Sequence, residues 1–92
     1  MTASDSPLLI DVRSDAEFAT TALVGAVNVP LPQLAARIAE FAPDPATPIV
    51  LYCASGGRSA MGCQLLRSLG YTDVADAGGL FAAAGRLGLP IR

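Results

Sequence analysis

The chain has 92 residues, 52% of them hydrophobic, and its six arginines against eight acidic residues leave a formal net charge of −2. This length fits one small domain over residues 1–92, and the acidic balance argues against nucleic acid as a main partner, because phosphate backbones need a basic face. There is no histidine, which excludes Cys-His and Ser-His catalysis, and the two cysteines lack a metal-binding spacing. We expect neither a metal nor a cofactor.

The opening segment, MTASDSPLLIDV, has no basic region followed by a long apolar stretch. A signal peptide and a membrane-spanning helix are therefore not expected. The predicted location is the cytoplasm, or the periplasm if the chain is the mature fragment of a longer precursor. No membrane partner is predicted.

The first half of the chain alternates two strand patterns with two helix patterns. The aliphatic run Leu8–Val12 predicts a buried strand, and Ser14 followed three residues later by Glu17 predicts a capping box at the start of a short helix. Ala26–Val29 predicts a second strand. Apolar residues at helical spacing, with polar residues between them, then predict an amphipathic helix over 31–41.

The second half repeats this order. Ile49–Tyr52 is the clearest strand pattern, and it is followed by a predicted helix over Arg58–Leu69. Gly70 stands where a helix C′ residue belongs, with Tyr71 as its hydrophobic partner. Val74–Ala77 predicts a fourth strand.

A glycine pair, Gly78 and Gly79, is expected to form a turn into a last, alanine-rich helix over 80–87. Four strand–helix units in succession predict an α/β fold, in which a mostly parallel sheet of four to five strands lies between two layers of helices. Ligand sites in such sheets lie at the carboxyl ends of the strands. Cys53 directly follows the third predicted strand, so this end of the sheet is the expected site.

The loop after that strand has the composition of a loop that stabilises the thiolate form of Cys53. Backbone amides of a small-residue loop and the positive end of a following helix both stabilise a thiolate over a thiol. The pair Gly56 and Gly57 allows the backbone turns that such a loop needs, and Arg58 adds a positive charge at its rim. Ser55 either donates its hydroxyl to the sulfur or only favours the turn.

Other residues have simpler interpretations. Cys63 lies among apolar residues of a predicted helix and is interpreted as inert filler. Asp11 and Arg13 lie at the end of the first strand, near the expected site. We favour a structural role for them, paired with each other or with loop backbone, and with Arg13 also in reach of Glu17. Ser59 is expected to cap the helix after the loop.

Five blocks of the sequence together resemble the single-domain rhodaneses, a family of sulfurtransferases. The blocks are LIDVRSDAEF (9–18), GAVNVPL (25–31), YCASGGRSA (52–60), LGYTDVADAGGL (69–80) and LGLPIR (87–92). They run in order over nearly the whole chain, and the short format is most similar to the phage-shock protein E type. The resemblance implies a rhodanese-like α/β/α sandwich.

The resemblance also implies a double-displacement reaction. Cys53 would take the outer sulfur of thiosulfate as a persulfide and pass it to cyanide or to a thiol acceptor, which includes a thioredoxin-like protein. The substrate-binding residues would be the rest of the loop, namely Ala54, Ser55, Gly56, Gly57, Arg58 and Ser59. That loop carries no charge between Cys53 and Arg58, so thiosulfate would bind weakly. The identity of the natural sulfur donor therefore stays open.

Two alternatives remain. Related phosphatases and arsenate reductases of this fold need five residues between cysteine and arginine, whereas four separate Cys53 from Arg58, and Tyr52 stands where phosphatases have histidine. Loop length therefore favours sulfur over phosphate. The second alternative is a persulfide carrier or a partner-binding module without turnover. Partner-binding domains of this family usually lose the cysteine, so the presence of Cys53 argues against an inactive domain but not against a carrier.

Overall fold

The structure is a computed structural model that describes residues 7–92, so the first six residues, on which part of the location prediction depends, lie outside it. Its sheet has four strands in the order β2-β1-β3-β4, and every neighbouring pair is parallel. The strands are β1 (Leu8–Asp11), β2 (Val27–Asn28), β3 (Ile49–Cys53) and β4 (Val74–Gly79). The predicted parallel α/β architecture is therefore confirmed.

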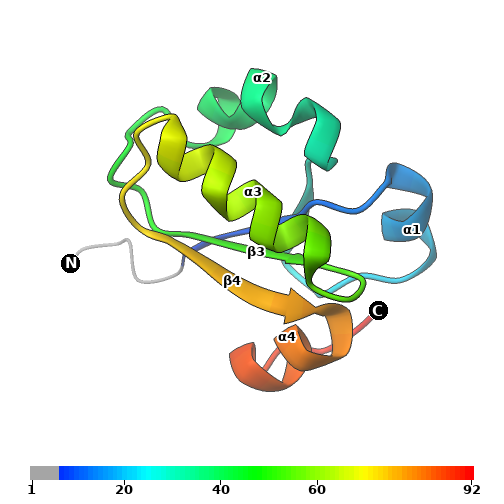
Figure 1. The fold of residues 1–92 in the computed structure, drawn as a ribbon. Coiled ribbons are helices and arrows are strands. Elements are labelled where there is room, and N and C mark those ends of the chain that lie inside the picture. The colour runs from blue at the N-terminus through cyan, green and yellow to red at the C-terminus, as the bar shows by residue number, and fades with distance from the viewer. Residues whose placement is uncertain (1–6) are drawn as a thin grey trace.

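The helices are α1 (Asp15–Thr20), α2 (Leu31–Phe41), α3 (Gly57–Ser68) and α4 (Leu80–Leu87). Figure 1 shows α2 and α3 side by side over one face of the sheet and α4 under the other face. The short α1 lies beside the sheet, near the loop that ends β3. This arrangement is the three-layer sandwich expected from the sequence.

Alternation along the strands builds a separate core on each face of the sheet. Ile10 and Leu51 belong to the cluster that α2 and α3 cover, whereas Leu9 and Tyr52 belong to the cluster that α4 covers. Successive side chains of a strand point to opposite faces, so one buried strand supplies both cores. Cys53 belongs to the α2–α3 side.

The helix ends follow the sequence signals closely. The capping box of α1 is present, with Ser14 and Glu17 each bonding the other's backbone N–H. At the end of α3, Gly70 has φ +101° and donates to the Arg67 carbonyl, while Tyr71 donates to the Leu66 carbonyl. These are the paired bonds of a Schellman motif, and they direct the buried Tyr71 ring back to the core.

The predicted turn at Gly78 and Gly79 is wrong, because both residues belong to β4. Gly79 pairs with Cys53 across the sheet after an irregularity in the register, and Gly78 has φ +84°. Glycine allows this bend without ending the strand, since it carries no Cβ. The sheet thus continues to the end of β4 beside the cysteine.

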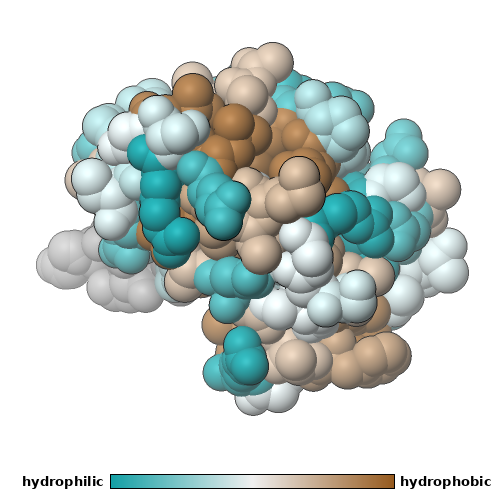
Figure 2. Space-filling model, viewed as in Figure 1, coloured by the Kyte–Doolittle hydropathy of each residue, from teal (hydrophilic) through white to brown (hydrophobic). Residues whose placement is uncertain are grey.

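Figure 2 shows apolar residues gathered over α2 and α3, flanked by hydrophilic residues on both sides. A separate apolar pocket of about 210 Å³ is lined by Pro7, Leu9, Val50, Leu87 and Leu89.

Over residues 7–92, no helix is both long and apolar enough to cross a lipid bilayer.

Candidate active site

Cys53 is the last residue of β3, and its side chain is 1% exposed. Its strand ends at the carboxyl edge of the sheet, directly before the loop 54–56 that leads into α3. The placement agrees with the rule that ligands bind at this edge of a parallel sheet. The sequence prediction for the position of Cys53 is therefore correct.

The Cys53 sulfur lies within a set of polar groups supplied by its own loop. The Gly56 N–H donates to Sγ at 2.9 Å, and the thiol donates to Ser59 Oγ at 3.5 Å. Burial by itself raises the pKa of Cys53, but once the thiol ionises it accepts hydrogen bonds from the Ser59 hydroxyl and from the backbone amides of Ser59, Gly56 and Ser55, which outweigh burial and lower this pKa. The loop consequently stabilises the thiolate form of Cys53 relative to that of an ordinary cysteine.

Ser59 does not cap α3, as the sequence suggested. The cap residue is Gly56, with φ +106°, and Ser59 is the third residue of the helix, fully buried. Its hydroxyl bonds the Gly56 carbonyl at 3.1 Å instead. Glycine at the cap frees the serine hydroxyl to point inward, toward the cysteine.

Asp76 is a site residue that the sequence analysis missed. It lies on β4, and its Oδ1 accepts hydrogen bonds from Ser59 Oγ at 2.7 Å and from the Gly78 N–H at 2.9 Å. A polar residue toward the carboxyl end of a neighbouring strand was the available signal, because parallel strands bring these ends together.

The loop packs backbone against backbone on the end of β4. A Cβ on Gly79 would lie 2.5 Å from the Ala54 carbonyl oxygen, a distance that real Cβ atoms do not adopt. Gly56 lies against Gly78, with 3.8 Å between its ideal Cβ position and the Gly78 Cα. Gly79, the second glycine of the Gly78–Gly79 pair, is therefore needed for the strand to approach the loop so closely.

Arg58 is not a free cation at the rim. Its guanidinium binds both carboxylate oxygens of Glu17, at 2.7 and 3.0 Å, and the two side chains are 40% and 37% exposed. The bond from Arg58, followed by the backbone bond at Ser14, lowers the pKa of Glu17 to about 2. Glu17 thus has two partners, the helix cap and Arg58, where the sequence suggested Arg13.

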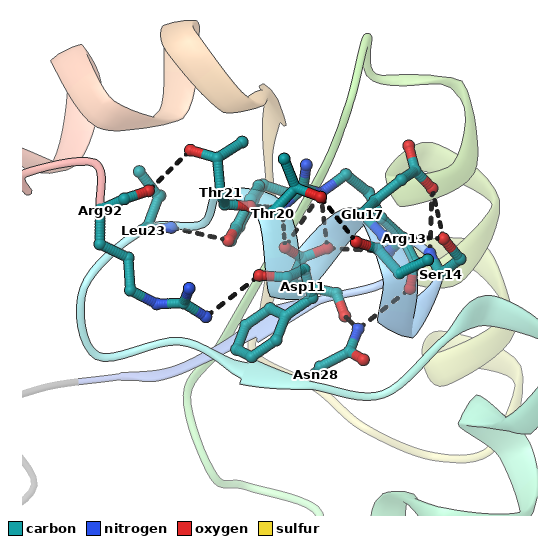
Figure 3. A network of polar contacts seen from close by, with 12 residues as sticks. Asp11, Arg13, Ser14, Glu17, Thr20, Thr21, Leu23, Asn28 and Arg92 are labelled. Atoms are coloured by element: carbon teal, nitrogen blue, oxygen red, sulfur yellow. Dashed lines mark hydrogen bonds and ion pairs between the residues drawn. The ribbon is translucent and has the colours of Figure 1, made fainter.

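Asp11 and Arg13 form a buried structural pair, as preferred from the sequence (Figure 3). Arg13 Nη2 lies 2.6 Å from Asp11 Oδ2 and also donates to the Thr21 carbonyl. Asn28 Nδ2 bonds the backbone carbonyls of both residues. The Arg13 guanidinium therefore joins β1 to the segment after α1, and the Asn28 amide ties β2 to the same backbone.

The side chains of Tyr52 and Cys63 are buried in the cores on opposite faces of the sheet. The Tyr52 hydroxyl accepts from the Leu23 N–H at 3.0 Å on the α4 side of the sheet, and burial raises its pKa to about 12. Burial raises the pKa of Cys63, with Asp76 adding to the effect. In the described part of the chain, no group of three or more candidate ligands could hold a metal ion.

Comparisons with known proteins agree with this geometry. The family model for the rhodanese-like domain matches residues 1–83. Thiosulfate sulfurtransferase PspE of Escherichia coli is 38% identical over 71 residues, which cover 77% of this chain and 68% of that protein. A sulfurtransferase of Allochromatium vinosum is 35% identical over 88 residues, which cover 96% of this chain and 80% of that protein.

The same relationship holds among solved structures. A structure described as a rhodanese with anions from E. coli superposes with a TM-score of 0.86 at 33% identity, covering 95% of this chain and 98% of that one. The rhodanese-like family model matches residues 1–83. This range contains all four strands, Cys53 at the end of β3 and the contact between Gly79 and the loop. The chain belongs to the rhodanese-like domain family.

Proposed function

We propose that this chain is a sulfurtransferase, a single domain over residues 1–92, that carries sulfane sulfur on Cys53. The observation that carries the proposal is the buried sulfur at the end of β3, held by the Gly56 N–H at 2.9 Å and adjoined by the Ser59 hydroxyl at 3.5 Å. Membership of the rhodanese-like family and the similarity to PspE, which is named a thiosulfate sulfurtransferase, support it.

The reaction has two displacements. In the first, the Cys53 thiolate attacks the outer sulfur of thiosulfate, the bond between the two donor sulfurs breaks, and sulfite leaves with its electron pair. The product is a cysteine persulfide anion, which the loop amides stabilise as they stabilise the thiolate. In the second, cyanide or a thiolate acceptor takes the outer sulfur and restores the Cys53 thiolate.

The loop residues 54–59 would bind the donor. Ala54, Ser55 and Gly57 are exposed, so a donor could reach them, and the amides that lower the pKa of Cys53 would also stabilise the transferred sulfur. Arg58 would hold the donor's oxyanion once it shares or leaves Glu17. We place thiosulfate or a similar anion as donor, and a small thiol, cyanide or a thioredoxin-like protein as acceptor. The cytoplasmic location stays a prediction.

Intact-mass measurement after incubation with thiosulfate tests the proposal. The wild type should gain the mass of one sulfur atom, and Cys53→Ser should gain none. Cys63→Ser is the matched control and should keep the gain, because that thiol is buried inside α3 and its pKa is raised rather than lowered. A wild type that gains no sulfur and forms no thiocyanate from cyanide would contradict the proposal.

A non-turnover persulfide carrier shares the same first step and differs in the second. It would keep the added sulfur in the presence of cyanide and small thiols and release it only to a specific protein. A phosphatase is disfavoured by the four-residue spacing of the loop and by the engagement of Arg58 with Glu17. Turnover of an aryl phosphate that Cys53→Ser abolishes would reverse this ranking.

A further inference from the structure

The Ser59 hydroxyl has one proton and three neighbouring acceptors. Its Oγ lies 2.7 Å from Asp76 Oδ1, 3.1 Å from the Gly56 carbonyl oxygen and 3.5 Å from Cys53 Sγ. The shortest of these contacts is to a carboxylate, and hydrogen bonds to charged acceptors are the stronger ones. While Cys53 is a thiol, the Ser59 proton therefore goes to Asp76, and Ser59 Oγ accepts the proton of the thiol.

Once Cys53 ionises, the Ser59 hydroxyl must donate a hydrogen bond to the sulfur instead of accepting one from it. A thiolate only accepts, so Ser59 can stabilise it only by turning its single proton away from Asp76. Asp76 then retains the Gly78 N–H at 2.9 Å, and water can replace the lost bond because the residue is exposed. The carboxylate and the thiolate therefore compete for one proton.

We propose that Asp76 is a positioning residue that acts through the single proton of Ser59 to set the pH at which Cys53 ionises, favouring the thiol at rest. The inference rests on the proposed role of Cys53 as nucleophile. A cysteine held as thiol is less open to oxidation than a thiolate, because oxidation follows thiolate character. In other enzymes a neighbouring base, often histidine, sets how readily the nucleophile ionises. This chain has no histidine, and the contact between Ser59 and Asp76 takes that role.

Other charged groups also surround the loop, and each is paired or bonded in a way that the substitution of Asp76 leaves in place. Arg58 is paired with Glu17, and the Asp11–Arg13 pair lies at the end of β1. On the β4 side, Arg67 of α3 bonds the Val74 carbonyl and Arg86 of α4 bonds the Ala77 carbonyl. A shift in the titration midpoint of Cys53 that follows substitution of Asp76 alone is therefore caused by loss of the Asp76 carboxylate.

The test is a pH titration of the ultraviolet absorbance of the thiolate. Each protein is measured against the same protein carrying Cys53→Ser, which subtracts Cys63 and the tyrosines. Asp76→Asn should lower the titration midpoint of Cys53 by about half a unit to one unit, the difference between a charge-assisted and a neutral hydrogen bond. Asp73→Asn removes another exposed carboxylate, from the segment just before β4, and should leave the midpoint nearly unchanged.

Ser59→Ala decides whether the effect passes through the hydroxyl. It should raise the midpoint, and Asp76→Asn added to it should produce almost no further shift, since coupled residues are non-additive. An equal shift from Asp76→Asn with and without Ser59 would overturn the inference, as would a shift no larger than that of Asp73→Asn. Asp76→Ala, which removes the acceptor, must lower the midpoint at least as far as Asp76→Asn; a smaller effect would also overturn it.

The titration needs no sulfur donor, so it separates this inference from the proposed function. A protein that shows the coupled shift but never gains sulfur would contradict only the sulfurtransferase proposal. A protein that gains sulfur on Cys53 but shows no coupled shift would contradict only the role of Asp76.

Discussion

Glu17 and Arg58 form a two-pronged ion pair that joins residues 41 positions apart, with contacts of 2.7 and 3.0 Å. Glu17 belongs to the first turn of α1, where it also completes the capping box, and Arg58 belongs to the first turn of α3. The pair neutralises the one cation of the proposed donor loop. The proposed anionic donor would therefore compete with Glu17 for the guanidinium.

Replacing Glu17 with Gln should strengthen donor binding by freeing Arg58. An exposed pair of this kind contributes about 0.2–1 kcal/mol, so KM for thiosulfate should fall by up to about fivefold, with a smaller change in kcat. Steady-state kinetics measure it. Glu40→Gln makes the same charge change on α2, where Glu40 lies 3.7 Å from Arg37, and should leave KM as it is. An unchanged KM in Glu17→Gln would mean that Arg58 does not contact the donor.

The same pair predicts a pH dependence of stability. Arg58, then the Ser14 backbone, lowers the pKa of Glu17 from 4.5 to about 2. A depressed folded-state pKa stabilises the native state above the unfolded pKa, and this contribution is lost as the pH falls toward the folded value. Urea unfolding should therefore show wild type more stable than Glu17→Gln near neutral pH, with the difference shrinking below about pH 4.5. A gap that stays constant down to about pH 3 would contradict this.

Breaking the Asp11–Arg13 pair should cost much more than any surface change. Both residues are buried, at 0% and 4% exposure, and Asp11→Asn leaves the Arg13 charge without its carboxylate. Loss of one partner of a buried pair destabilises by about 3–5 kcal/mol, a large share of the stability of so small a domain. Chemical denaturation measures it, with Glu40→Gln at an exposed pair as the comparison. Similar losses for the two variants would refute the structural role of Asp11.

A methyl group at Gly79 should damage the loop and the sheet together. The added Cβ would lie 2.5 Å from the Ala54 carbonyl oxygen, which is backbone and cannot rotate away. Gly79→Ala should lower both the free energy of unfolding and the rate of persulfide formation. Gly85→Ala is the matched control: it lies in α4 with nothing within 4 Å, and should raise stability by about 0.5–1 kcal/mol through helix propensity. Normal persulfide formation in Gly79→Ala would show that the loop tolerates displacement.

The sequence by itself determined the units of the fold and the position of the proposed nucleophile. Hydrophobic periodicity, the Ser14–Glu17 capping box and Gly70 at a helix end are local signals, because each depends on residues within a few positions of one another. They located the elements to within one or two residues, apart from the glycines of β4. A cysteine at the end of the third strand follows from the same local reading.

Only the tertiary structure decided which side chains meet. Glu17 pairs with Arg58 across 41 residues, and Asp76 reaches Ser59 across 17, because parallel strands bring the carboxyl ends of distant segments to one edge of the sheet. The same packing made Gly79 part of a strand, since its backbone lies against the Ala54 carbonyl. Such contacts depend on register and crossing geometry, which no short stretch of sequence encodes. The charge of the loop rim and the partner of the Ser59 proton were therefore decided by packing.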